Sequence, residues 1–419
     1  MAQSPIYMDG HATTRVDPRV VAAMVPFFGE HYGNAASRHH QFGWAARDAV
    51  VEARLAVARL IGATSREVVF TSGATESNNL ALKGVVDASR ARGNHIVTVS
   101  TEHRAILDPC ARLEQQGVAV SYLPVRGDGL LDPDTLAAAL RPATVLVSVM
   151  SANNEIGVLQ PIGDLARVAH SGGALFHTDA AQAVGHVKID VSEDDIDLLS
   201  MTAHKLYGPK GIGALYVRRG LTLTPLVDGG GHESGLRSGT LNVPAIVGLG
   251  HAARLCLAEM SRESERLTQL RNRLWHGLQQ ALPGVSVNGS MTSRLPHNLN
   301  VTFDGVDGDQ LLIGLDDVAV SSGAACSSSR RTPSHVLKAL GLREAAAQAS
   351  IRFGLGRFNT DEEIDYVVEK LRGLVARLRA PVPVFELEDD APGLPPGWAE
   401  AEDRPNRQGL KSATRSKVD

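Results

Sequence analysis

The chain has 419 residues, of which 43% are hydrophobic and 21% charged, a composition typical of a globular protein with two or three domains. Its formal net charge is -4 and its 42 basic residues are dispersed, so we exclude nucleic acid as a direct ligand. The N-terminal segment has no basic region followed by an apolar run, and no stretch of about 18 apolar residues occurs later, so neither export nor a membrane span is predicted.

Short β-rich runs alternate with helical patterns through the first half of the chain. The expected strands are EVVFTSG, HIVTVSTEH, VAVSYLPV, TVLVSVMSA, ALFHTDAAQ, IDLLSMTAH and GIGALYV. The expected helices between them are ATESNNLALKGVVDASRAR, RAILDPCARLEQQG and LDPDTLAAAL. This alternation predicts βαβ units and a mostly parallel, doubly wound sheet, which is an α/β fold.

A glycine-rich loop, DGGGHESGLRSGT, and a helical stretch from about Val243 to Leu282 lead into a second pattern of mixed strands and helices. We predict an N-terminal segment (1-15) that packs with a small domain, a large domain (16-258), and a small α+β C-terminal domain (259-380) with a mobile loop at 321-333. The remainder, 381-419, is rich in Pro, Gly and charge and is predicted to be a disordered tail.

The three cysteines, Cys110, Cys256 and Cys326, are too few and too far apart for a disulfide framework or a four-ligand zinc site. We therefore predict no metal site and a reducing cytoplasm. Cys110 and Cys256 lie in amphipathic helical patterns that are typical of core thiols. Cys326 lies in GAACSSSRRTPS, a segment with little apolar surface to pack, although a buried thiol at a strand end is the alternative.

Lys205 in SMTAHKLYGPKG follows an expected strand and precedes a tight turn. A lysine at a strand end is ordinarily only solvated, but lysine amines also form Schiff bases with pyridoxal phosphate. That cofactor needs a phosphate cradle, a carboxylate at its pyridinium nitrogen and a group over its ring.

The segment TSGATESNN runs from an expected strand directly into a helix. The N–H groups of Gly73, Ala74 and Thr75 could therefore hold a phosphate at the positive end of the helix dipole. The alternative is an ordinary helix cap formed by Thr75 or Ser77.

Three more polar residues end or follow expected strands. Asp179 could pair with a pyridinium nitrogen, Gln182 could reach the ring oxygen, and His103 could stack on the ring and move protons. Each has a structural alternative, a turn cap for Asp179 and a purely structural imidazole for His103. Ligands bind at the carboxyl ends of strands in doubly wound sheets, where all of these residues are expected, so their conjunction favours a pyridoxal phosphate site.

The chain resembles cysteine desulfurases of the NifS/IscS type, members of the class V aminotransferase family with the fold type I of pyridoxal-phosphate-dependent transferases. The resemblance covers residues 6-380 and rests on the motifs SGATESNN, TEH, NNEIG, HTDAAQ, AHKLYGPKGIGALY, GGGHESGLRSGT, SSGAACSSSRRTPSHVLKALGL and SIRFGLGRF.

The resemblance implies a role for each matching residue. Lys205 binds pyridoxal 5'-phosphate covalently, Asp179 pairs with its ring nitrogen, Gln182 bonds its ring hydroxyl, and His103 stacks and acts as acid and base. The other residues implied are Ala74, Thr75, Thr202 and His204 at the phosphate, Asn154 at cofactor and substrate, Arg352 and Asn34 at the substrate, and Thr240 at the phosphate of a neighbouring subunit in a homodimer.

The reaction implied by the resemblance takes sulfur from L-cysteine, leaving alanine and a persulfide on Cys326. The persulfide is passed to an acceptor protein, such as an iron–sulfur scaffold or a tRNA-thiolation enzyme, and Cys326 could be a transient cluster ligand shared with a scaffold. Arg330 and Arg331 could help to hold the thiolate or its acceptor, although arginines in loops are usually only solvated.

The sequence departs from the family pattern at three places. Gly10 and His11 replace the commoner Asn-Ala before ATT, Ser234 stands where a basic residue is frequent, and the C-terminal tail has no recognised scaffold-docking segment. Thr202 stands where serine is common and keeps the hydroxyl. A selenocysteine lyase, a true aminotransferase of the same fold and a non-enzymatic binding module are the alternative functions.

Overall fold

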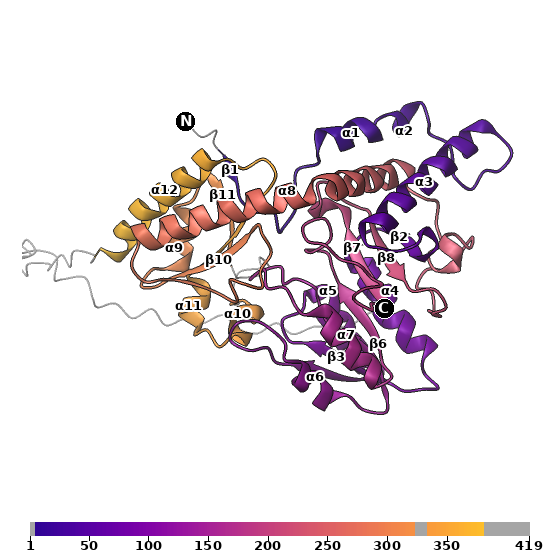
Figure 1. Cartoon of the computed structure of the whole chain (residues 1–419), viewed down its shortest axis with the longest axis horizontal. Coiled ribbons are helices and arrows are strands. Elements are labelled where there is room, and N and C mark those ends of the chain that lie inside the picture. Colours follow the sequence, from indigo (N-terminus) through magenta and orange to yellow (C-terminus); the bar gives the residue numbers. More distant parts are fainter. Residues whose placement is uncertain (1–4, 323–332, 381–419) are drawn as a thin grey trace, which may run out of the picture. The chain divides into compact units, whose positions relative to one another are not determined.

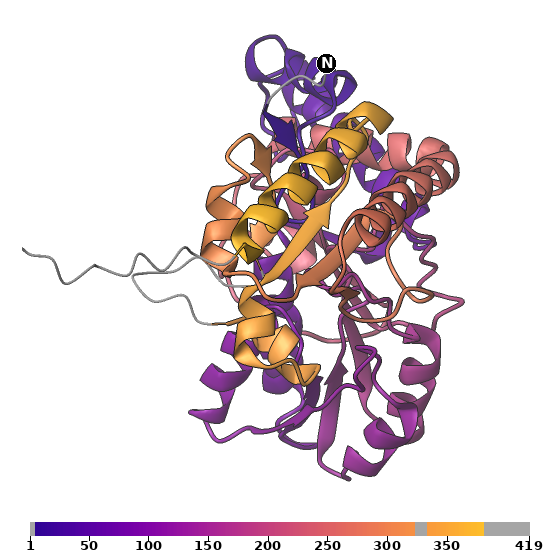
Figure 2. The same ribbon diagram turned by 90° about the vertical axis from the view of Figure 1, so that its left-hand side faces the viewer.

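The computed structural model describes residues 5-322 and 333-380, and Figures 1 and 2 show them in two views. The predicted tail (381-419), the thiol of Cys326 and the arginines Arg330 and Arg331 lie outside the described residues. Up to Arg379 the described chain forms one compact unit that contains a two-stranded pair and two larger sheets. The long helix α8 (Val243–Ala281) runs past both of the larger sheets (Figure 1).

The larger sheet has seven strands in the order β2-β8-β7-β6-β5-β3-β4. Their bounds are β2 Val68–Thr71, β3 His95–Val99, β4 Ala119–Leu123, β5 Thr144–Ser148, β6 Leu175–Asp179, β7 Leu198–Thr202 and β8 Gly213–Val217. All pairings between β4, β3, β5, β6 and β7 are parallel, whereas β8 is antiparallel to both of its neighbours. The prediction of a mostly parallel α/β sheet is confirmed.

Helices cover both faces of this sheet, as buried strands require. Alternate residues of β2 show the division, because Val68 and Phe70 belong to one core and Val69 to the other. The first core contains residues of α3 (Gln41–Leu60), α6 (Pro133–Ala139), α7 (Ile162–Ser171) and α8, and the second contains residues of α4 (Ala74–Ala88) and α5 (Arg104–Glu114). The remaining elements of this region are α1 Pro18–Met24, α2 Pro26–Gly29, and the 3-10 turns η1 Ser65–Glu67, η2 Ala203–Lys205 and η3 Glu233–Gly235.

The smaller sheet is antiparallel, in the order β12-β13-β10-β9, and has its own hydrophobic core against α12 and the second half of α8. Its elements are β9 Val285–Val287, β10 Asn298–Phe303, β12 Ser321–Ser322, β13 Ser350–Gly354, α9 Gly308–Ile313, α10 His335–Ala339, α11 Glu344–Gln348 and α12 Asp361–Arg379. A separate parallel pair joins the N-terminal β1 (Ile6–Tyr7) to β11 (Val318–Ala319), so the start of the described chain lies beside this region. The predicted domain boundary at 258/259 falls inside α8, which runs through it unbroken, and that division stays a prediction.

Helix α8 is long and apolar enough to cross a membrane by length and composition alone. Half of its most apolar window is buried within the protein. Its buried residues pack with α3 in one core and with α12 in the other, so α8 serves as a core helix of the described fold.

The elements missed from the sequence include four helices of the larger region. The helices α1, α2 and α3 precede the first expected strand, and α7 lies between β5 and β6. The antiparallel direction of β8 was also not predicted, since strand composition carries no information about the direction of pairing.

Candidate active site

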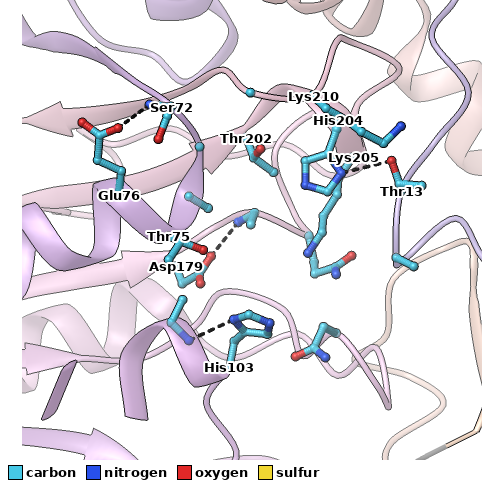
Figure 3. A pocket seen from close by; sticks show the side chains of 18 of the residues that line it. Thr13, Ser72, Thr75, Glu76, His103, Asp179, Thr202, His204, Lys205 and Lys210 are labelled. Carbon is cyan, nitrogen blue, oxygen red and sulfur yellow. Dashed lines mark hydrogen bonds between the residues drawn. The ribbon is translucent and has the colours of Figure 1, made fainter. Parts of the chain in front are cut away.

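A cavity of about 490 Å³ opens at the carboxyl ends of the parallel strands (Figure 3). This edge is where open α/β sheets bind ligands. The lining includes nine residues that the sequence predicted, namely Gly73, Ala74, Thr75, His103, Asn154, Asp179, Gln182, Thr202 and His204, together with Lys205. The fold therefore brings together side chains that are more than 130 positions apart in the chain, because they lie at the ends of five strands of one sheet, β2, β3, β5, β6 and β7.

The first turn of α4 faces this cavity with free backbone donors. Its N-cap residue Gly73 has a φ of 154° and provides no side-chain cap, while the Ser77 hydroxyl is bonded to Thr71 at 2.8 Å instead. The alternative, an ordinary helix cap formed by Thr75 or Ser77, is therefore not observed. A Cβ at Gly73 would meet only the Thr202 hydroxyl, at 3.7 Å. The Gly73 N–H has a partner in the Thr71 hydroxyl at 3.4 Å, whereas no described residue accepts from the N–H groups of Ala74 and Thr75. These two donors lie at the positive end of a 15-residue helix, which suits a phosphate.

Asp179 ends β6 and is held in one orientation by two hydrogen bonds. Asn78 Nδ2 donates to its Oδ2 at 2.7 Å, and the backbone N–H of Ala181 donates to Oδ1 at 2.9 Å. Both oxygens accept, which is the arrangement of a carboxylate anion. Asn78 is thus a positioning residue that the sequence did not identify, although it lies within the SGATESNN motif.

Lys205 ends the 3-10 turn that follows β7, and its side chain projects into the cavity (Figure 3). Burial lowers the pKa of its amine to about 8, with the charge of Arg352 acting in the same direction and that of Asp179 opposing it. His186 Nε2 donates to the Lys205 carbonyl at 2.8 Å, which anchors the backbone below the amine. At neutral pH a useful fraction of this amine is uncharged and nucleophilic.

His103 caps α5 and faces the cavity (Figure 3). The backbone N–H of Ala105 donates to its Nδ1 at 3.1 Å, so a neutral ring carries its proton on Nε2. Desolvation lowers the pKa of this imidazole more than the neighbouring Asp179 carboxylate raises it. The ring is therefore neutral at pH 7, with a proton available at Nε2.

Gln182 and His204 both form hydrogen bonds with residues of the N-terminal segment. The Gln182 amide is paired with His11, and His204 Nδ1 lies 3.2 Å from the Thr13 hydroxyl. Burial lowers the pKa of His204 to about 4, so this imidazole is neutral. Thr13 was not identified from the sequence as a site residue, although the ATT motif was an available signal, whereas His11 was noted there only as a departure from the family pattern.

Arg352 on β13 is not part of the cavity lining but lies directly behind Asn154. Its Nη1 donates to the Asn154 carbonyl at 2.9 Å, and its Nη2 forms an ion pair with Asp9 at 2.7 Å. Its buried Nε has no partner among residues 5-322 and 333-380, so one donor of the guanidinium is unused within the described part of the chain. Binding of a substrate carboxylate by Arg352 stays a prediction.

Asn34 and Thr240 are exposed and do not line the cavity of their own chain. Asn34 Oδ1 accepts from the backbone N–H of Ala36 at 2.9 Å in a local turn. The glycine-rich loop that carries Thr240 is anchored at two points: Arg237 Nε bonds Glu76 on α4 at 2.8 Å, and the Glu233 carboxylate bonds Arg54. The roles predicted for Asn34 and Thr240 stay predictions.

The two described cysteines are buried and free, as their helical patterns predicted. Burial raises the pKa of both Cys110 and Cys256 to about 12. Both therefore remain thiols at neutral pH and are poor nucleophiles. No group of three or more possible metal ligands occurs among residues 5-322 and 333-380, where no metal site was expected.

Residues 6-367 match the family model of the class-V aminotransferases, so the chain belongs to the aminotransferase class-V family. Its curated relatives include the cysteine desulfurase IscS of Anaeromyxobacter dehalogenans (strain 2CP-C), which is 54% identical over 93% of this chain and 97% of its own length. The protein of the same name from Dechloromonas aromatica (strain RCB) is 52% identical over 92% of this chain and 96% of its own.

Solved structures agree with this assignment. A NifS-like protein superposes with a TM-score of 0.83 at 37% identity, covering 89% of this chain and all of its own. A structure described as SspA in complex with cysteine gives a TM-score of 0.76 at 38% identity, over 85% of this chain and all of its own. The resemblance stated from the sequence motifs, and the fold class, are confirmed.

Members of this family depend on pyridoxal 5'-phosphate, and the residues of the cavity fit that group. The uncapped α4 terminus suits its phosphate, Asp179 its ring nitrogen, and the Lys205 amine its aldehyde. Gln182 and His103 supply a hydrogen-bond donor and a flat ring along the same cavity.

Proposed function

We propose that this chain is a pyridoxal-phosphate-dependent cysteine desulfurase. The observation that carries the proposal is that three features line one cavity. They are the Lys205 amine, the Asp179 carboxylate with its two hydrogen bonds, and the uncapped N-terminus of α4. The curated relatives that align over nearly the whole chain are named as enzymes of this activity.

Each side chain has a defined task. Lys205 would hold the cofactor at its aldehyde carbon, Asp179 would keep the ring nitrogen protonated, and His103 would supply a flat ring with a proton on Nε2. When bound, pyridoxal phosphate withdraws electrons from the Cα of an amino acid substrate. A neutral His103 with its proton on Nε2 would donate that proton near pH 7, and the uncharged part of the Lys205 population would accept one.

The sulfur is taken by Cys326, which lies outside the described residues. The thiolate of Cys326 forms a bond to the sulfur of L-cysteine while the Cβ–S bond of the substrate breaks. The electron pair of the broken bond stays on the substrate Cβ, which takes up a proton, so that the product is L-alanine. Cys326 is oxidised to a persulfide as the substrate carbon is reduced, so no other oxidant is required. The two described cysteines, Cys110 and Cys256, do not compete with Cys326 for the substrate sulfur, because burial keeps their thiols protonated.

The wild-type protein tests this function directly. Incubated with L-cysteine and a thiol reductant, it should form alanine and sulfide in equal amounts, and both should be measured in the same sample. A keto acid in place of alanine would indicate an aminotransferase. Activity on selenocysteine with none on cysteine would indicate a selenocysteine lyase.

We further propose a homodimer in which a second copy covers an apolar surface formed by residues 21-51. This surface exposes seven large apolar side chains, namely Val21, Val25, Phe28, Tyr32, Phe42, Trp44 and Val51. Phe28 and Tyr32 are 68% and 66% exposed, an arrangement that costs free energy unless a partner covers it. Thr240, which does not reach the cavity of its own chain, would then be free to complete the site of the second copy.

Replacement of Phe28 by aspartate should weaken the dimer by about 30-fold or more, because a charge at a central aromatic contact is poorly tolerated. Light scattering during size exclusion over a range of protein concentrations measures this shift. Ile313→Asp is the matched control, since Ile313 is 65% exposed but lies on α9, outside the apolar surface. A monomeric wild type, or an equal shift in both variants, would contradict the proposed interface.

The acceptor of the persulfide is proposed to be a protein, either an iron–sulfur scaffold or a tRNA-thiolation enzyme. Transient cluster ligation by Cys326 belongs to the scaffold case. A cytoplasmic location is proposed because a reducing compartment keeps thiols such as Cys110 and Cys256 free.

A further inference from the structure

His11 lies at the centre of a chain of hydrogen bonds that runs from Arg294 to the cavity. The members of this chain, which we name the Arg294–Gln182 relay, are Arg294, Asn298, His11 and Gln182. All four side chains are buried. His11 stands where the family commonly has alanine, so the resemblance does not account for it.

The outer end of the relay has only one possible orientation. Arg294 Nη1 donates to Asn298 Oδ1 at 2.9 Å, and Asn298 Nδ2 donates to the Glu155 carbonyl at 3.2 Å. A guanidinium can only donate and a carbonyl can only accept, so both contacts assign the Asn298 amide in the same way. Asn298 Nδ2 therefore has one further hydrogen to donate, and this nitrogen lies 3.0 Å from His11 Nε2.

That contact determines the tautomer of His11. Because Asn298 donates to Nε2, a neutral His11 must carry its proton on Nδ1. The ring is neutral because burial lowers its pKa far below the usual range, and the charges of Arg352 and Lys205 add to this effect. Close approach to β13 leaves the ring little freedom, since a Cβ at Gly354 would lie 2.8 Å from His11 Cδ2.

The inner end of the relay gives the same assignment independently. His11 Nδ1 lies 2.9 Å from Gln182 Oε1, and Gln182 Nε2 donates to the backbone carbonyl of His11 at 3.1 Å. The carbonyl can only accept, so Nε2 is a donor and Oε1 accepts the Nδ1 proton. Of the two hydrogens on Nε2, one is thus engaged, and no described residue accepts the other, while Gln182 lines the cavity.

We propose that His11 is a positioning residue that holds the Gln182 amide with its oxygen turned away from the cavity and an N–H turned toward it. The inference rests on the proposed function, in which the ring oxygen of the cofactor accepts that N–H. A donor at this position stabilises the ionised form of the oxygen, and an inverted amide would present a repelling carbonyl oxygen instead.

Three substitutions at position 11 separate this role from packing. His11→Asn places an amide N–H where Nδ1 stood, His11→Gln offers polar atoms only farther out, and His11→Ala offers none. We expect the pH midpoint of the cofactor's visible absorption to rise by about one unit in His11→Ala and His11→Gln. His11→Asn should titrate as the wild type does.

A double-mutant cycle provides a second test of the expected shifts in the absorption midpoint. In a Gln182→Ala background the midpoint is already raised, and adding His11→Ala should shift it no further. His297→Asn serves as the packing control, since its ring stacks on His11 at 4.5 Å without a hydrogen bond to Gln182. If His11→Asn shifts as His11→Ala does, or if His11→Ala leaves the midpoint unchanged while Gln182→Ala raises it, the proposal is wrong.

A measurement without the cofactor separates this inference from the proposed function. In protein labelled with ¹⁵N-histidine, NMR should find the His11 proton on Nδ1, with the signal assigned by its loss in His11→Asn. A proton on Nε2 would overturn the relay even in an active desulfurase. A wild type with no visible cofactor absorption would contradict the proposed function and leave the tautomer result to decide the relay.

Discussion

Lys205→Ala should abolish alanine formation from L-cysteine, with a loss of at least about 10³-fold, and should remove the visible absorption of the bound cofactor. Lys205 is the lysine whose amine is desolvated to a pKa of about 8 and projects toward Asp179 and His103. Without it, no amine in this position can hold an aldehyde. Absorption spectra and alanine quantification on the same preparations measure both losses.

Lys210 provides the matched control. It lines the same cavity five positions later but is exposed to solvent. Lys210→Ala should keep the visible absorption, because this side chain is exposed to solvent and the Lys205 amine remains in place. An absorption band that survives in Lys205→Ala and disappears in Lys210→Ala would reverse the assignment.

Cys326→Ala should reduce turnover by at least about 10³-fold while the cofactor stays bound and coloured. The reason is chemical, since the thiolate that accepts sulfur is lost while all the residues of the cavity remain. Mass spectrometry of the wild type after incubation with L-cysteine should find one added sulfur atom on the peptide that contains Cys326. Sulfide release by the variant at a rate near that of the wild type would reject this nucleophile.

The buried cysteines are the controls for that experiment. Cys110→Ala and Cys256→Ala each remove a thiol whose pKa is raised to about 12, so both variants should keep most of the activity. Each substitution should instead lower the free energy of unfolding, because each thiol is packed in a hydrophobic core.

The sequence predicted much of the larger sheet because a buried strand bounded by polar turn residues is a local signal. Thus Asp179, Lys205 and His103 could be assigned to strand ends, and strand ends of one sheet converge. Helix α3 was missed although it is 20 residues long, since its many small residues give only a weak apolar stripe.

Motif order along the chain, and the residue types at the strand ends, were sufficient by themselves to determine the family and the kind of cofactor. Only the tertiary structure decided which neighbours hold those residues: Asn78 on Asp179, Asp9 on Arg352, and His11 on Gln182, which is 171 positions away. The physical reason is that a strand end is encoded by a few adjacent residues, whereas the direction of a buried hydrogen bond depends on every donor and acceptor packed around it.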